Sequence, residues 1–147
     1  MTRHYRTKIS GLGLCVALAL GGLVGCPGPT FVVQQYAGPQ RDAYTIAVLR
    51  VNGGDSVRLL SLDGEDMRAP IASDGRLHVE LLPGRHVVAA YDEKEPNRRA
   101  LPVAFGAEAG KVYRVVLAGE SAHVYEVDRG SDATVRDVSA DATARGD

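Results

Sequence analysis

The stretch from Leu77 to Tyr91 reads LHVELLPGRHVVAAY, and its pattern decides the fold. In its first five residues, leucine and valine alternate with His78 and Glu80, which is typical of a strand with one face on a core and one face in water. Its last seven residues are nearly all apolar, which indicates a buried strand. Between them, Pro83 presets φ at one central turn position and Gly84 takes positive φ at the next. The stretch therefore predicts two β-strands joined by a tight turn.

Similar short runs, separated by turn signals, recur on both sides of this stretch. Residues 45–51 are apolar on both faces, which predicts a central strand, and Asn52-Gly53-Gly54-Asp55 supplies the positive-φ residues of a hairpin loop. Pro102 cannot donate a backbone hydrogen bond, so the run 101–105 is expected at a sheet edge or a bulge. Further runs lie at 56–62, 111–118 and 123–128. About seven strands and no convincing helical period predict an all-β fold, a single β-sandwich over residues 44–129.

The segments that flank this predicted domain differ from it in composition. Residues 27–43 contain three prolines and two glycines, and we expect residues 26–43 to form a flexible tether, with Phe31, Val32 and Val33 either docked on the domain or lying at the lipid surface. Residues 130–147 are mostly Asp, Ala, Ser, Thr and Arg with two valines, and we expect them to be a disordered tail.

The first 25 residues have the layout of an export signal. Residues 1–8 are cationic and contain no acidic residue, and residues 9–25 (ISGLGLCVALALGGLVG) are apolar and small. This apolar run is shorter than the roughly 20 residues that a membrane-spanning helix needs, and it is rich in glycine. We therefore expect residues 1–25 to be a signal peptide that is removed.

Leu23-Val24-Gly25-Cys26, at the end of that segment, resembles the lipobox of bacterial lipoproteins. The resemblance implies cleavage before Cys26, a diacylglycerol on its thiol and acylation of the new amine. Several acyl chains, at roughly 0.8 kcal/mol per buried CH₂, would hold the protein firmly at a membrane. The alternatives are a secreted protein with a coincidental cysteine and an uncleaved membrane helix.

The cysteine count fits this interpretation. Cys15 would be discarded with the signal, so the mature domain would contain no disulfide. Pro27 stands where an Asp often marks retention in the inner membrane of enteric bacteria. This favours the outer membrane, with the domain facing the periplasm, and leaves the inner membrane and the cell surface as alternatives.

Size and charge limit the classes of partner. A chain of 147 residues, 45% hydrophobic and 24% charged, suits one globular domain. Three of its 17 basic residues lie in the export segment, so removal of that segment leaves 14 basic against 18 acidic residues, a net charge of about −4. Proteins that bind nucleic acid usually carry clustered Lys and Arg, and this chain has an acidic excess, so nucleic-acid binding is not expected.

A second resemblance covers about residues 44–128. The segments 80–88 (ELLPGRHVV) and 107–113 (AEAGKVY) look like a pattern in small bacterial lipoproteins, in which L-x-P-G-x-H closes one hairpin and A-G-x-x-Y opens a later strand. PEGA-type and carboxypeptidase-regulatory-like β-sandwich modules are similar. The resemblance implies a sandwich fold and an envelope setting, and it brings no catalytic residues.

Histidines are the main candidates for chemistry. His78 and Glu80 lie two apart on a predicted strand, hence on one face, where an imidazole and a carboxylate could hold a metal ion. His86 lies across the turn and could reach that face, whereas His123 lies on another predicted strand. Only two possible ligands have a defined position, which is too few for a metal site. The pattern therefore favours a solvated strand face, with His86 hydrogen-bonded to nearby backbone. No metal site, cofactor or catalytic residue is therefore predicted.

The acidic residues gather in loops beside glycine and arginine. Paired carboxylates can hydrolyse glycosides only in a cleft whose apolar or aromatic walls push their pKa values apart. With 5% aromatic residues and no Trp, such a cleft is not expected. We expect solvated turns at Asp63, Glu65, Asp66, Asp92, Glu93 and Glu95.

Together these features predict an envelope lipoprotein whose domain binds another envelope protein and is not an enzyme. One alternative is a structural or accessory subunit of an envelope assembly or secretion machine, and another is a small periplasmic hydrolase or metal-binding protein. A pocket that brings together His78, Glu80 and His86 would favour the last of these. A free sheet edge or an exposed apolar patch would favour partner binding.

Overall fold

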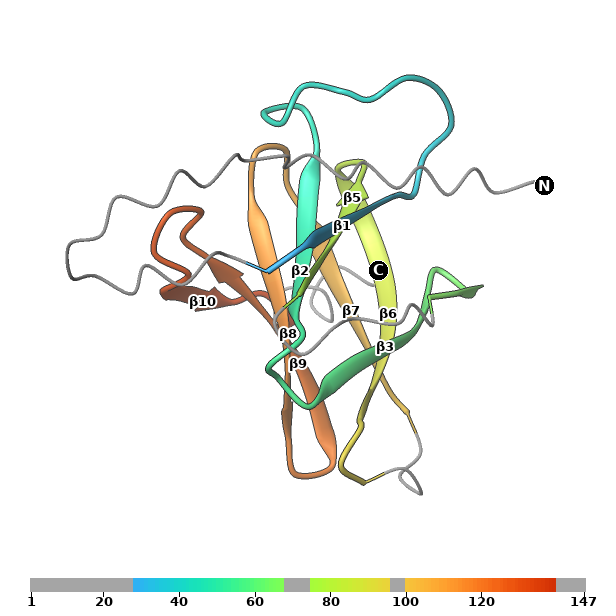
Figure 1. Ribbon diagram of the computed structural model, residues 1–147, viewed down its shortest axis with the longest axis vertical. Helices are drawn as coiled ribbons and strands as arrows, with labels where there is room; N and C mark the ends of the chain where they lie inside the picture. The colour runs from blue at the N-terminus through green and yellow to red at the C-terminus, as the bar shows by residue number, and fades with distance from the viewer. Residues whose placement is uncertain (1–27, 68–74, 96–99, 140–147) are drawn as a thin grey trace, which may run out of the picture.

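A computed structural model of the chain describes residues 28–67, 75–95 and 100–139, and these residues form two β-sheets (Figure 1). The six-stranded sheet contains, in spatial order, β1 (Thr30–Gln34), β5 (Arg76–Leu81), β2 (Ala47–Asn52), β8 (Val112–Ala118), β9 (Ser121–Val127) and β10 (Thr134–Asp137). The four-stranded sheet contains β4 (Glu65–Asp66), β3 (Val57–Leu62), β6 (Gly84–Asp92) and β7 (Leu101–Ala107). The prediction of an all-β sandwich is confirmed, with ten strands in the described residues instead of about seven. No helix in the described part of the chain is long and apolar enough to cross a membrane.

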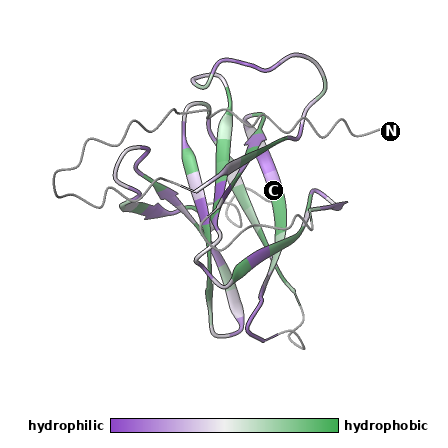
Figure 2. Cartoon of the chain, viewed as in Figure 1, coloured by the Kyte–Doolittle hydropathy of each residue, from purple (hydrophilic) through white to green (hydrophobic). Residues whose placement is uncertain are grey.

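The core lies between the inner faces of the two sheets. Hydrophobic and hydrophilic residues alternate along several strands (Figure 2), as expected when one face of each sheet is buried. The rings of Phe105 and Tyr113 meet across the core with their centroids 5.4 Å apart. The fully buried side chains come from both sheets, and they include Leu49, Leu62, Leu77, Val79, Leu81, Val88, Phe105, Tyr113 and Val124.

Several connections cross from one sheet to the other. The predicted hairpin at residues 52–55 is wrong, because β2 and β3 belong to different sheets. The Pro83-Gly84 turn, a hairpin according to the family resemblance, likewise links β5 to β6 across the two sheets. In each case the chain folds over the edge of the core, and both strands keep their apolar faces buried. A true two-residue hairpin joins β3 to β4, where Asp63 (φ 51°) and Gly64 (φ 81°) both take the positive φ of a type I′ turn.

Two other expectations about strand position are confirmed. β2 lies in the interior of the six-stranded sheet, between β5 and β8. β7, which contains Pro102, lies at an edge of the four-stranded sheet.

Both flanking segments contribute strands to the sandwich, which corrects the predicted limits of the domain. Residues 30–34, expected in the tether, form β1, which pairs in parallel with β5 and packs Phe31 and Val33 against the core. Residues 134–137, expected in the tail, form β10, and Val138 after it is buried. β1 is only five residues long and is preceded by prolines and a glycine, and β10 is mostly polar and exposed, so neither segment carries a clear strand pattern. Residues 1–27, with the predicted signal peptide and Cys26, lie outside the described residues, as do residues 140–147.

We expect Phe105→Ala to lower the free energy of unfolding by about 3–5 kcal/mol, because it removes a fully buried ring and leaves a cavity beside Tyr113. Urea unfolding followed by circular dichroism measures the change. Val87→Ala on the neighbouring strand β6 is the control. Because Val87 is 43% exposed, this substitution should lower the free energy of unfolding by less than about 1 kcal/mol. Equal losses in the two variants would contradict the placement of the core.

Candidate functional site

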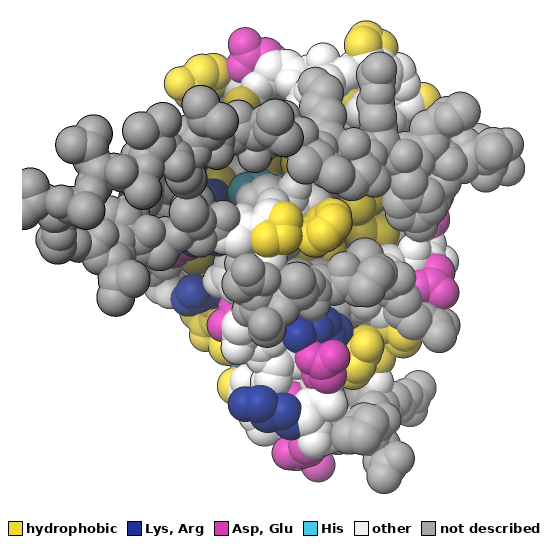
Figure 3. All heavy atoms as spheres, viewed as in Figure 1, with side chains coloured by type: hydrophobic (Ala, Val, Ile, Leu, Met, Phe, Trp, Pro, Cys, Tyr) yellow, Lys and Arg dark blue, Asp and Glu magenta, His cyan; other side chains and the backbone are white. Residues whose placement is uncertain are grey.

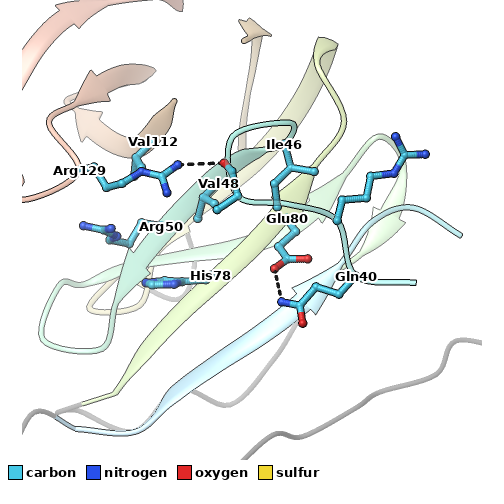
Figure 4. A pocket seen from close by; sticks show the side chains of 10 residues that line it. Gln40, Ile46, Val48, Arg50, His78, Glu80, Val112 and Arg129 are labelled. Carbon is cyan, nitrogen blue, oxygen red and sulfur yellow. Dashed lines mark hydrogen bonds between the residues drawn. The ribbon is translucent and has the colours of Figure 1, made fainter. Parts of the chain in front are cut away.

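A pocket with a cavity volume of about 240 Å³ opens on the outer face of the six-stranded sheet (Figure 4). Its floor comes from alternate residues of three strands, which point away from the core because their neighbours in sequence point into it: Val48, Arg50, His78, Glu80 and Val112. The connection between β1 and β2 forms one wall with Gln40, Arg41, Ala43 and Ile46, and Arg129 approaches after β9. Residues from four separate parts of the chain therefore meet here.

Glu80 stands at one end of this pocket and is already well bonded. Its carboxylate accepts hydrogen bonds from the Tyr36 hydroxyl at 2.8 Å and from the Gln40 side-chain amide at 3.1 Å. Because the β1–β2 connection lies over it, Glu80 is only 7% exposed. The expectation of a solvated strand face is therefore wrong at Glu80. Burial also raises the pKa of Tyr36 above its usual value.

His78 and Arg50 stand side by side on the pocket floor (Figure 4), directly opposite each other in the β2–β5 register. Burial, followed by the positive charges of Arg50 and Arg76, lowers the pKa of His78 below its ordinary value of 6.5. At neutral pH the imidazole is therefore uncharged. Its Nε2 atom is buried and has no hydrogen-bond partner among the described residues.

Two arginines complete the site, and the sequence pattern did not single them out. Arg50 pairs through Nη1 with Asp132, while its Nε is buried without a partner in the described part of the chain. Arg129 donates from Nη2 to the carbonyls of Ala43 at 3.2 Å and Gly110 at 3.0 Å. The alternation along β2 would have placed Arg50 outward, but no local signal brings Arg129 to this face.

His86 lies on β6 in the other sheet and does not join His78 and Glu80. Its Nε2 lies 2.8 Å from the Leu82 carbonyl, so the expected bond to nearby backbone is confirmed. Its Nδ1 lies 2.6 Å from the Asp63 carboxylate, which also accepts the backbone N–H of Val87. Asp63 therefore ties a turn to a strand and is more than a solvated loop residue. In the residues described, no three His, Cys, Asp or Glu side chains gather as metal ligands would.

His123 lies beside an aspartate and a serine, but their arrangement differs from that of a catalytic triad. Asp137 lies 3.0 Å from its Nδ1, and the Ser139 hydroxyl lies 3.5 Å from the same nitrogen. In a Ser-His-Asp triad the carboxylate and the serine bind opposite ring nitrogens. Here Ser139 also bonds Asp137 directly, so the cluster joins β9 to the end of β10.

Glu126 is a buried carboxylate at the core side of β9, 5% exposed. It accepts hydrogen bonds from Lys111 at 2.7 Å and from Arg136 at 2.9 Å. The Lys111 bond is the main reason that the pKa of Glu126 lies below its ordinary 4.5, with Arg136 acting in the same direction against the cost of burial. The three side chains link the start of β8 to β9 and β10.

Comparison of the chain with protein-family models, with curated proteins and with solved structures finds no match.

The lowered pKa of Glu126 predicts a loss of stability in acid. Because the unfolded carboxyl takes up its proton near pH 4.5, the stabilisation is fully present above that pH and is lost as the pH falls through the lower folded value. We expect Glu126→Gln to lower the free energy of unfolding by about 1–2 kcal/mol at pH 7 and to flatten its dependence on pH between 5 and 3. Urea unfolding at each pH tests this.

Glu120→Gln, in the exposed β8–β9 turn, removes the same charge as a matched control. It should cost less stability at pH 7 than Glu126→Gln. If both variants kept the wild-type acid profile, Glu126 would not be the group responsible.

Proposed function

We propose that this protein is a lipid-anchored protein of the bacterial cell envelope, whose β-sandwich domain acts by binding another envelope protein. The anchor rests on the sequence Leu23–Cys26, which resembles a lipobox. The compartment we propose is the periplasmic face of the outer membrane, on the strength of Pro27 after the cysteine.

The observation that supports binding is the edge strand β1, whose outer edge pairs with no other strand in the part of the chain that the structure describes. An edge strand has unpaired backbone groups that can bond to another chain, and proteins usually prevent this with charged residues, proline or a very short strand. β4 has two residues, both acidic; β7 contains Pro102; β10 contains Arg136 and Asp137. β1 reads TFVVQ, with neither charge nor proline, and within the described residues it pairs with β5 alone. A partner strand could therefore extend the six-stranded sheet at β1.

The position of β1 in the chain links this edge to the anchor. β1 begins at Thr30, four residues after Cys26. At about 3.3–3.6 Å per extended residue, those four residues reach at most about 14 Å. A lipid on Cys26 would hold the β1 edge close to the bilayer, so the proposed partner would meet it at the membrane surface.

The anchor is tested by Cys26→Ser in the full chain. We expect this variant to lose incorporation of radiolabelled palmitate and to remain an uncleaved precursor, because serine lacks the thiol that accepts diacylglycerol. Cys15→Ser is the matched control and should label like the wild type. Labelling that persisted in Cys26→Ser would overturn the anchor.

The binding edge is tested by photo-crosslinking in cells. A photoreactive residue in place of Val32, which is 39% exposed on β1, should give one reproducible protein adduct. The same residue in place of Val87, similarly exposed on the other sheet, should not give that adduct. An adduct common to both positions, or none from Val32, would argue against a partner at the β1 edge.

A further inference from the structure

The pocket on the six-stranded sheet holds two polar atoms that lack a hydrogen-bond partner among the described residues: Nε of Arg50 and Nε2 of His78. Buried polar atoms are nearly always satisfied by protein, by water or by a ligand. An arginine Nε is always a donor, and a neutral imidazole can carry its hydrogen on Nε2. The two side chains lie side by side on paired strands (Figure 4), so both can donate toward one acceptor.

Arg129 and Arg41 bring further positive charge to the rim. The bonds of Arg129 go to two neutral carbonyls, and its guanidinium lies 5.8 Å from the centre of the Tyr44 ring. Arg41 lies over the Tyr36 ring at 5.4 Å. Neither guanidinium pairs with a carboxylate in the part of the chain that the structure describes, so both charges are available to an anion.

The charge balance indicates the sign of the charge that an occupant would carry. Arg41, Arg50 and Arg129 line the pocket, and Arg76 is near enough to lower the pKa of His78. The carboxylates facing these cations are Glu80 within the pocket and Asp132 on Arg50. With His78 neutral, positive charges outnumber negative ones, so an anion matches the pocket and a cation does not.

The shape and lining of the pocket limit the rest of the occupant. Ile46, Val48 and Val112 contribute apolar surface beside the polar groups. The cavity volume of about 240 Å³ falls below the roughly 300–1,000 Å³ of sites for drug-sized ligands. In Figure 3 several of the few visible basic side chains lie beside acidic ones, whereas the pocket lining contains three arginines and one carboxylate. The occupant would therefore be a small molecule with an apolar body and one acidic end.

We propose that this pocket binds a small aliphatic monocarboxylate, whose carboxylate accepts hydrogen bonds from Arg50 and His78 and whose apolar body lies on Val48 and Val112. Arg129 adds charge at the rim. This inference is independent of the proposed partner at the β1 edge, because the site lies on the outer sheet face and needs no second protein.

The test uses the full chain in a non-ionic detergent at constant ionic strength, with butyrate as the probe. Isothermal calorimetry should detect saturable binding, and the His78 ring protons should shift in NMR spectra while those of His123 do not. Arg129→Gln should weaken binding by about tenfold, the effect of losing one charged contact. Arg129→Lys, which keeps the charge, should retain most of the affinity. Arg85→Gln removes an exposed arginine from β6 on the other sheet and should leave binding unchanged.

Butylamine and inorganic phosphate serve as the comparison probes. Butylamine has a similar apolar body and the opposite charge, so it should not bind. Phosphate lacks an apolar body, so it should bind more weakly than butyrate. Equal binding of butylamine, stronger binding of phosphate, or no saturable binding of butyrate would each overturn the proposal. So would full butyrate affinity in Arg129→Gln.

Discussion

Phe105 from the four-stranded sheet and Tyr113 from the six-stranded sheet pack against each other in a core that neither sheet could close alone. The chain crosses between the sheets after β2, β4, β5 and β7, so each half of the sequence contributes to both layers. Because apolar side chains fill the space between the inner faces, a polar side chain of the six-stranded sheet either lies on its outer face or, like Glu126, is paired with charged partners. The pocket, with His78 and Arg50 on its floor, follows from that division between the two faces.

Local patterns in the sequence predict strands well and their partners poorly. Alternation over residues 77–81 and the continuous apolar run after Arg85 identify two strands, and the structure contains both. The glycines at residues 52–55 correctly mark a change of direction. They do not tell a hairpin from a crossing between sheets, because the buried face of a strand has the same period of two in either arrangement. β1 was missed because its alternation is short and its parallel partner, β5, lies more than forty residues away.

Only the part of the candidate site that depends on local spacing could be predicted from the sequence. Spacing of two residues puts His78 and Glu80 on one face, and the structure confirms this. The pattern could not show that Tyr36 and Gln40 would cover Glu80, since that contact joins residues about forty apart. Nor could it show that His86, only eight residues after His78, would belong to the opposite sheet. Contacts of the β1–β2 connection and the approach of Arg129 are long-range, so they appear only once the sandwich is assembled.

The place of β1 at the edge of its sheet has a mechanical consequence. Any force applied to the chain before Thr30 enters the folded domain through this strand. A pull along the strand axis loads its hydrogen bonds to β5 together, whereas a pull across the strand breaks them one after another. Loss of β1 would uncover Phe31 and Val33 and one side of β5, while the contact of Phe105 with Tyr113 would persist. β1 is therefore the first strand of the sandwich that a force from the N-terminal side loads, and the force reaches β2 only after β1 has separated from β5.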